Sequence, residues 1–289
     1  MRIRLSIVKR GRLAAIALCA CLQLLPVVIS AEEMTGCKAD ARPLVFGILP
    51  FMSVEHLVTR FSPLANYLAR HLQVPVRIET APNFVEFARR THQDQRYDIL
   101  FTAPHFHSHA VSKAGYRLVA SVDSAGMWAV IVVPLNSDIH SIEDLRGKRL
   151  AAVQPMALAT LLVRNHLFEA GIDPDVDLSL VITPSHDASL LSSYHGVTDA
   201  SALMQPPFEA ASETVRDSMR VIARTQSTPH IPISVGSWIS GACAVEISAL
   251  LLDMDASDEG RAVLKHNNFS GFTQGNPEVY EALNRMLFR

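Results

Sequence analysis

The sequence predicts an α/β protein built from two lobes, each a mainly parallel sheet flanked by helices, with a ligand cleft between the lobes. Short apolar segments alternate with segments of helical periodicity along most of the chain. Three apolar segments run directly into a helix start, where free backbone N–H groups meet the carboxyl ends of parallel strands and ligands collect. These junctions lie at Leu44–Phe51, Tyr97–Ser108 and Leu150–Pro155.

The first lobe is expected to begin with three strand-helix units. Its first helix is the clearest, because Ser53 can cap it and apolar residues recur every three or four positions from Leu57 to Leu72. The expected strands are 44–48, 74–79 and 98–101, and two further helices cover 84–88 and 106–113. We assign residues 42–125 to this lobe and expect the tail, residues 233–289, to return to it.

The second lobe, residues 126–232, is expected to repeat this alternation. Pro134 closes a strand at 128–133, and the segment Ser141–Asp144 has the capping-box pattern of a helix that ends at Gly147. The remaining expected elements are strands at 148–153, 178–182 and 219–223, helices at 157–170 and 187–194, and tail helices around 245–252, 258–265 and 277–288. We assign no strand to 196–203. Two crossings then connect the lobes.

The first 31 residues indicate a secretory signal peptide. Basic residues precede an uncharged, mostly apolar run at 13–29, and the small residues Ser30 and Ala31 follow it. We expect cleavage there and a soluble chain in the periplasm. The alternative is an uncleaved anchor, because a run of about seventeen residues is at the lower limit for a spanning helix. Beyond this segment only Cys37 and Cys243 remain, and their spacing leaves open whether they pair.

Composition and motifs exclude several classes of function. The net charge of −2 and the pI near 6.6 provide no basic field, so no nucleic-acid partner is expected. Glycine-rich phosphate and dinucleotide motifs and the Gly-x-Ser-x-Gly turn are all missing from the sequence. Ser185, His186 and Asp187 are adjacent and cannot form the relay of a nucleophilic triad. We therefore expect no enzymatic activity and no cofactor. We also expect a monomeric chain.

Seven segments, in their order and spacing, resemble the periplasmic substrate-binding proteins of phosphate, phosphite and phosphonate ABC transporters. They are 46–50, 63–68, 81–84, 97–105, 139–149, 185–188 and 269–272. The likeness covers nearly all of the chain beyond the signal peptide. It implies a type II periplasmic binding protein, not an enzyme, that delivers a small ligand to an ABC permease in the inner membrane.

The resemblance also implies a ligand set. Where phosphonate binders begin a helix with Ser-Thr-Ser-Gly, this chain has Ala157-Leu158-Ala159-Thr160, so three hydroxyl donors are missing. The family's two aromatic contacts align with Phe84, which keeps the ring and lacks the phenol hydroxyl, and with Met127, which is not aromatic. Its histidine and its acid match His186 and Asp199. Together with residues at the predicted strand ends, the expected ligand set is Phe51, Phe84, Thr102, His105, Met127, Ala157, Leu158, Ala159, Thr160, His186 and Asp199.

The expected cleft is unusually apolar, because Met52 and Met156 add to the apolar members of this set. It would suit a partly apolar ligand related to phosphate or phosphonate oxyanions, and simple phosphonates should bind weakly. Each of these apolar residues could instead belong to the core. Three alternatives stay open: a sensor whose ligand-bound form is recognised by a membrane histidine kinase, an enzyme on the same fold, and capture of copper or zinc. A metal would use His105, His107 or His109 with Met127, Met156 or His186.

Overall fold

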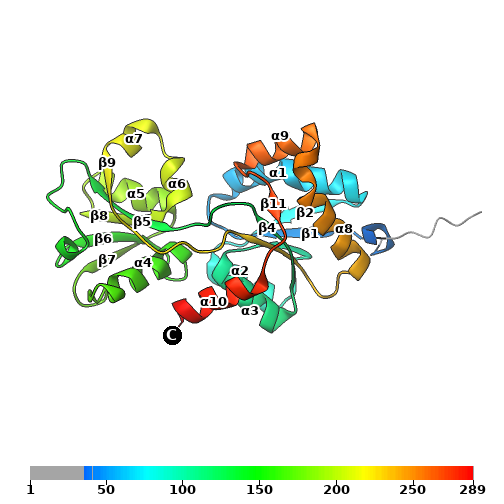
Figure 1. Ribbon diagram of the computed structural model, residues 1–289, viewed down its shortest axis with the longest axis horizontal. Helices are drawn as coiled ribbons and strands as arrows, with labels where there is room; N and C mark the ends of the chain where they lie inside the picture. The colour runs from blue at the N-terminus through cyan, green and yellow to red at the C-terminus, as the bar shows by residue number, and fades with distance from the viewer. Residues whose placement is uncertain (1–35, 41, 289) are drawn as a thin grey trace, which may run out of the picture. The chain divides into compact units, whose positions relative to one another are not determined.

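The computed structural model describes residues 36–40 and 42–288, which form two separate β-sheets with helices on their faces (Figure 1). The predicted signal peptide lies outside the described residues. The first sheet, called sheet 1 here, has six strands in the order β11-β4-β10-β3-β1-β2. The second, sheet 2, has five strands in the order β7-β6-β8-β5-β9. The predicted α/β class with two sheets is confirmed.

Sheet 1 combines a parallel core with antiparallel strands. Its strands are β1 (Leu44–Ile48), β2 (Val76–Glu79), β3 (Ile99–Phe101), β4 (Arg117–Val122), β10 (Pro232–Val235) and β11 (Phe272–Thr273). Strand β1 pairs in parallel with both β2 and β3, whereas β10 runs antiparallel between β3 and β4. The sheet is therefore completed by strands that follow sheet 2 in the sequence.

Sheet 2 uses one continuous stretch of the chain. Its strands are β5 (Ala129–Pro134), β6 (Arg149–Val153), β7 (Ser179–Thr183), β8 (Ala200–Met204) and β9 (Met219–Arg224). Strand β6 pairs in parallel with β7 and β8, and β5 runs antiparallel to β8 and β9. Both sheets are thus mixed, because the two crossings bring β5 and β10 in against the direction of the parallel strands.

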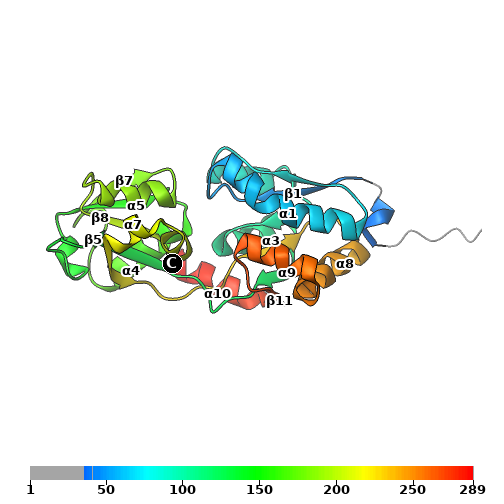
Figure 2. The ribbon, with the colours of Figure 1, turned by 90° about the horizontal axis from the view of Figure 1, so that it is seen from above.

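Helices cover both faces of each sheet (Figures 1 and 2). The α-helices are α1 (Val54–Leu72), α2 (Phe84–His92), α3 (Pro104–Ala114), α4 (Leu158–Glu169), α5 (His186–Tyr194), α6 (Gln205–Glu209), α7 (Glu213–Asp217), α8 (Gly241–Leu252), α9 (Asp258–Asn267) and α10 (Pro277–Leu287). Short 3₁₀ helices cover η1 (Gly36–Asp40), η2 (Glu143–Leu145) and η3 (Met254–Ala256). In the described part of the chain, none of the helices has both the length and the apolar character to cross a membrane.

The alternation of side chains along the central strands explains these layers. In β5, Ile131 belongs to the core shared with α4, whereas its neighbour Val130 packs in the cluster that contains Leu190 of α5. In β3, Phe101 faces the core with α1, whereas Leu100 lies with Phe106 of α3. Both sheets are therefore buried on two faces, which is why their central strands are almost continuously apolar.

Several elements differ from the sequence-based expectations. Strand β8 lies in the segment to which no strand was assigned, and β4, β10 and β11 were not expected. The capping-box pattern at 141–144 begins only the short η2, although Asp144 does accept hydrogen bonds from the backbone N–H groups of His140 and Ser141. Short strands of small residues, such as Ala200–Met204, carry little β-propensity and owe their pairing to their neighbours.

Two structural details join distant parts of the chain. Cys37 and Cys243 form a disulfide between η1 and α8. The two segments that cross between the sheets pair with each other, because Met127 and Thr228 exchange both backbone hydrogen bonds at 2.8 and 2.7 Å. Helix α10 lies against α3, while its Leu283 belongs to the core of sheet 2. The crossings and α10 therefore connect the two sheets.

Candidate ligand-binding cavity

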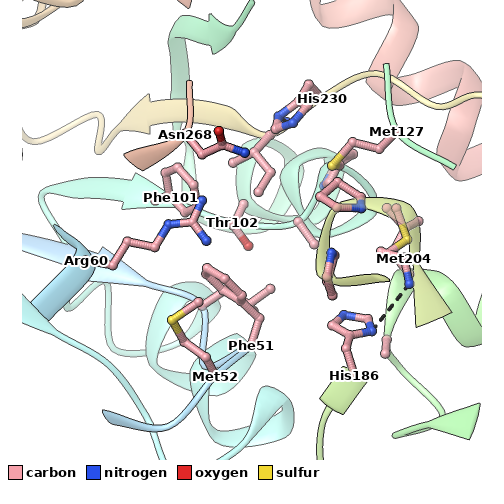
Figure 3. A pocket seen from close by; sticks show the side chains of 18 of the residues that line it. Phe51, Met52, Arg60, Phe101, Thr102, Met127, His186, Met204, His230 and Asn268 are labelled. Atoms are coloured by element: carbon pink, nitrogen blue, oxygen red, sulfur yellow. Dashed lines mark hydrogen bonds between the residues drawn. The ribbon is translucent and has the colours of Figure 1, made fainter. Parts of the chain in front are cut away.

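A cavity of about 550 Å³ lies among elements of both sheets, within the volume range of small-molecule sites, about 300–1,000 Å³. It is formed where β1, β3 and β8 end and where α3, α4 and α5 begin, as the layout of parallel strands requires. Figure 3 shows the side chains that surround it. The segment after β9 and the loop after α9 complete the wall with His230 and Phe269.

Two helix starts at the cavity lack side-chain caps. The residues Ala103 and Ala157, which precede α3 and α4, line the cavity and cannot accept a hydrogen bond through a side chain. By contrast, Ser53 and Ser185 cap α1 and α5 through their hydroxyl oxygens. The first N–H groups of an uncapped helix have no partner within the helix and attract negative charge. At α3 fewer of them are free than at α4, because Pro104 has no N–H and the Phe106 N–H donates to the Ala103 carbonyl at 3.0 Å. The cavity therefore offers backbone donors to an anion.

Three histidines in the cavity wall are neutral near pH 7. Burial lowers the pKa of His105, His186 and His230 to about 4 in each case. The Nδ1 atom of His186 accepts from the backbone N–H of Met204 at 3.4 Å, and that of His230 accepts from Ile231 at 2.8 Å. A neutral imidazole that accepts at Nδ1 must carry its proton at Nε2. His186 and His230 can therefore donate to a ligand without being charged.

His105 connects the start of α3 with the loop after β6. It is fully buried, and its Nε2 donates to the carbonyl oxygen of Met156 at 2.9 Å. The proton is assigned to Nε2 because a carbonyl only accepts, and this leaves Nδ1 as an acceptor with no partner in the described structure. His105 therefore joins residues packed on sheet 1 to a loop of sheet 2 directly beside the cavity.

The structure gathers most of the expected ligand set at this cavity. The lining includes Phe51, Phe84, Thr102, His105, Met127, Ala157, Leu158 and His186, and also Met52. Ala159, Thr160 and Asp199 do not line it: Ala159 is fully buried in the core of sheet 2, and the Thr160 hydroxyl donates to the carbonyl of Val153 at 2.7 Å. Met156 is 40% exposed and is likewise outside the lining.

Asp199 lies at the wrong end of its strand for contact with this cavity. It immediately precedes β8, whereas Met204, the last residue of β8, is the one that reaches the cavity. Five residues of extended strand separate the two ends by roughly 17 Å. The carboxylate of Asp199 instead accepts from the backbone N–H and the guanidinium of Arg149. Its position in the structure is that of a strand-start residue.

The side chains of the three histidines at 105, 107 and 109 do not meet at one site. His105 lines the cavity, His107 is buried with its Nδ1 at 3.0 Å from the Ser234 hydroxyl, and His109 lies beside His92. Within the described residues, no group of three or more His, Cys, Asp or Glu side chains could hold a metal ion. This arrangement gives no support to capture of copper or zinc by these side chains.

Arg60 is the only arginine or lysine among the described cavity residues, and sequence reasoning missed it. It comes from α1, and its guanidinium points into the cavity near Phe101 and Asn268 (Figure 3). The periodicity of α1 contained a signal, because Arg60 follows Leu57 by three residues and precedes Leu64 by four. A cation at that spacing lies beside the buried apolar face of the helix. His230 and Phe269 were also missed, since they come from segments with no helix start, and Met204 was missed because it ends β8, a strand that was not expected.

Residues 46–280 match the family of phosphonate ABC transporter periplasmic substrate-binding proteins. The chain belongs to this family. The match spans most of the chain and includes every lining residue of the cavity. Members of this family are non-enzymatic substrate-binding components of ABC transporters, so the chain is a binding protein.

Solved structures of binding proteins share the fold of this family member. A phosphonate transporter component from Pseudomonas aeruginosa has a TM-score of 0.76 at 17% identity, over 85% of each chain. PhnD1 from Prochlorococcus marinus, solved with methylphosphonate, has a TM-score of 0.77 at 17% identity, over 85% of this chain and 97% of its own. The aliphatic sulphonate binding protein of Escherichia coli has a TM-score of 0.54 at 17% identity, over 85% and 84%.

Proposed function

We propose that this chain is the ligand-capturing component of an ABC importer and binds a small organic oxyanion with an apolar substituent, such as an organophosphonate, in the cavity described above. The observation that carries the proposal is the combination of two uncapped helix starts with an apolar wall. The helix starts offer N–H donors to an anion. Phe51, Phe84, Met127 and Leu158 offer an apolar surface to the rest of the ligand.

The binding protein acts in a particular compartment and with a particular partner. A signal peptide at 1–31 directs the chain to the periplasm, where it acts as a monomer and delivers its ligand to an inner-membrane permease. Residues 42–125 with 233–289 form one lobe and residues 126–232 the other, and ligand contacts with both lobes favour the closed state. The structure of Prochlorococcus marinus PhnD1 with methylphosphonate supports this ligand class.

The missing hydroxyls determine the order of affinity that we expect among ligands. Ala157 and Leu158 line the cavity where phosphonate binders of the family have Ser and Thr, and each hydroxyl lost removes a donor to a charged oxygen. Such hydrogen bonds contribute roughly 1.5–3 kcal/mol apiece. An apolar substituent on the ligand offsets part of this loss by covering the ring and thioether surface. Phenylphosphonate should therefore bind more tightly than methylphosphonate, and methylphosphonate more tightly than phosphate.

Titration calorimetry with these three compounds tests the proposal. The variant Phe84→Ala should weaken phenylphosphonate by on the order of 1–3 kcal/mol, the usual contribution of a buried apolar side chain. Phe168→Ala is the matched control, because Phe168 lies on α4 with 51% of its surface exposed. Binding of phosphate in preference to both phosphonates, or equal affinity of the Phe84→Ala variant, would contradict the proposed ligand class.

A further inference from the structure

Arg60 is held in a fixed place at the cavity by apolar rings and one backbone carbonyl. Its guanidinium carbon lies 5.6 to 6.0 Å from the ring centroids of Phe61, Phe269 and Phe51. One Nη2–H donates to the backbone oxygen of Asn267 at 2.6 Å. A guanidinium has five N–H donors, so this contact leaves donors for a further partner. The rings hold the guanidinium plane and restrict how it can turn.

The charge of Arg60 is not compensated by the protein. Within the described residues Arg60 forms no ion pair with a carboxylate, and it is the only Lys or Arg in the cavity wall. Asp187 is the one carboxylate there, and it is exposed at the start of α5. The three lining histidines considered above are neutral near pH 7. Arg117 and Arg220 also donate to backbone carbonyls, but neither lines the cavity.

The effect of this charge is visible on a neighbouring side chain. Besides burial, the positive charge of Arg60 lowers the pKa of His230. Burial also lowers the pKa of Arg60 itself, although a guanidinium stays protonated in proteins. A half-buried cation without a counter-charge is costly unless an anion joins it, because partial exclusion of water strengthens its electrostatic interactions.

We propose that Arg60, and not the helix starts alone, binds the anionic group of the ligand, so that the ligand's charge lies at the α1 side of the cavity and its apolar body extends toward Met127 and Met204. The proposal rests on the proposed function, in that this cavity is the ligand site. Figure 3 shows Arg60 and Asn268 on one side of the cavity, His186 and Met204 on the other, and Thr102 between them.

This placement defines the substrate class more narrowly than the helix starts do. A guanidinium binds carboxylate, sulfonate and phosphonate groups through paired N–H donors. The opposite wall of thioethers and neutral imidazoles favours a ligand whose other end is uncharged. The substrate is therefore an amphiphilic anion with one charged end, and a small inorganic oxyanion would leave the apolar side of the cavity uncovered.

Calorimetry with phenylphosphonate and benzenesulfonate on Arg60 variants tests this inference. Arg60→Gln should lower the affinity for both compounds about tenfold to a hundredfold, the range for losing hydrogen bonds to a charged group. Arg60→Lys keeps the charge without the planar fork and should lose less. Arg70→Gln is the matched control, because Arg70 lies on the same helix, pairs with Glu259 and is exposed. Thermal unfolding of each variant verifies that it is folded.

A second measurement separates direct binding from a structural role of Arg60. In the wild type, benzenesulfonate bound at Arg60 should offset its charge and raise the pKa of His230, followed by NMR of the imidazole. In Arg60→Gln the pKa of His230 should already be raised without the anion, and the anion should change it little. An unchanged pKa of His230 in saturated wild-type protein would overturn the inference.

The outcomes distinguish the two proposals. If the wild type binds phenylphosphonate and Arg60→Gln binds it equally well, the inference about Arg60 is wrong and the proposed function stands. If the wild type binds benzenesulfonate but no phosphonate, and Arg60→Gln loses that binding, the inference stands and the organophosphonate proposal fails. If neither compound binds the wild type, both proposals are wrong.

Discussion

In both sheets an aspartate precedes a central strand and makes the same hydrogen bonds, but the two aspartates are buried to different degrees. Asp98 precedes β3 and Asp199 precedes β8. Each exchanges hydrogen bonds with one residue of the neighbouring strand: the Asp98 carboxylate accepts from the Val45 N–H and its own N–H donates to the Val45 carbonyl, and Asp199 does the same with Arg149. Each carboxylate also accepts from an arginine side chain, that of Arg42 or of Arg149.

Burial makes the two carboxylates unequal. The side chain of Asp98 is 4% exposed and also accepts from Trp238 Nε1 at 2.8 Å, whereas the side chain of Asp199 is 32% exposed. Burial alone would raise the pKa of Asp98, but the hydrogen bonds from Arg42, Val45 and Trp238 outweigh it and lower the pKa. An aspartate next to a strand thus has a structural role in both sheets. Its contribution to the free energy of unfolding depends on how far its carboxylate is excluded from water.

The largest predicted effect comes from Asp98→Ala. Removing this carboxylate leaves the Trp238 and Val45 donors unsatisfied, so the free energy of unfolding should fall by about 3–5 kcal/mol, since each buried donor left without a partner costs about 1–3 kcal/mol. Asp199→Ala should cost about 1 kcal/mol or less, because exposed pairs contribute little. Urea unfolding measures both. Equal losses in the two variants would refute the role that we assign to burial.

The pH dependence provides the control for this pair. The folded-state pKa of Asp98 is lowered, so the stability that it adds is present above the pKa of the unfolded carboxyl and is lost as the pH falls through the folded value. The difference in stability between the wild type and Asp98→Ala should therefore shrink under acidic conditions. A difference that is constant down to strongly acidic pH would show that packing, not charge, is responsible.

The next largest effect is expected from the disulfide, which lies among the helices packed on sheet 1 and has no counterpart on sheet 2. Cysteines are absent from residues 126–232, whereas Cys37 and Cys243 join η1 to α8. Replacing both by alanine should lower the free energy of unfolding by about 2–4 kcal/mol, since the bridge closes a long loop. Reducing agent should destabilise the wild type similarly and leave the double variant unchanged in thermal unfolding. A reductant-insensitive wild type would contradict this.

Two threonines should separate stability from binding. Thr160 donates to the buried Val153 carbonyl and does not line the cavity, whereas Thr102 lines it. Thr160→Val should lower the free energy of unfolding by about 1–2 kcal/mol and leave the affinity for phenylphosphonate unchanged. Thr102→Val should weaken this ligand with a smaller effect on stability. Calorimetry and urea unfolding on both variants measure the contrast, and a loss of affinity in Thr160→Val would return Thr160 to the ligand set.

The smallest predicted effect is that of pH near neutrality on ligand affinity. Because burial lowers the pKa of His105, His186 and His230 to about 4, these side chains stay uncharged between about pH 6 and 8. The affinity for benzenesulfonate, which is charged throughout, should be constant there and rise only as the pH approaches 4 and the histidines become cationic. His266 also lines the cavity, so the measurement is made on the variant His266→Gln. A step in its affinity near the usual histidine pKa, about 6.5, would show that one of the three is solvated in the ligand-free cavity.

The sequence predicted those parts of the fold that local patterns determine. Strands β1 and β6 are apolar runs next to turn residues, and α1 shows a clear periodicity with Ser53 as its cap. Strand β8 was missed because Ala and Ser carry little local preference for a strand, and only its position between β6 and β5 makes it one. Strand β10 is four residues long and begins with a proline.

The candidate site likewise contains residues that local sequence patterns indicate and residues that only the folded chain brings together. The helix starts at Ala103 and Ala157 follow from strand-helix junctions, so sequence reasoning reached them. Arg60 did not follow, because a cation on a helix is ordinarily solvated and its partners Asn267 and Phe269 lie some 200 residues away in the chain. Asp199 was placed at the ligand by family resemblance, whereas the direction of β8 places it at the opposite end of the strand.

The order of strands also has a consequence for how the chain is made. All of sheet 2 lies between residues 129 and 224, so its strands can pair as soon as that stretch has emerged from the ribosome or from a secretion channel. In sheet 1, β10 lies between β3 and β4, and it is synthesised only after sheet 2 is complete. Until residues 232–235 arrive, β3 and β4 have unpaired edges, and Cys37 has no partner until Cys243 follows. The earlier half of the protein is therefore the later one to finish folding, and its unpaired strand edges stay open to other partners during this interval.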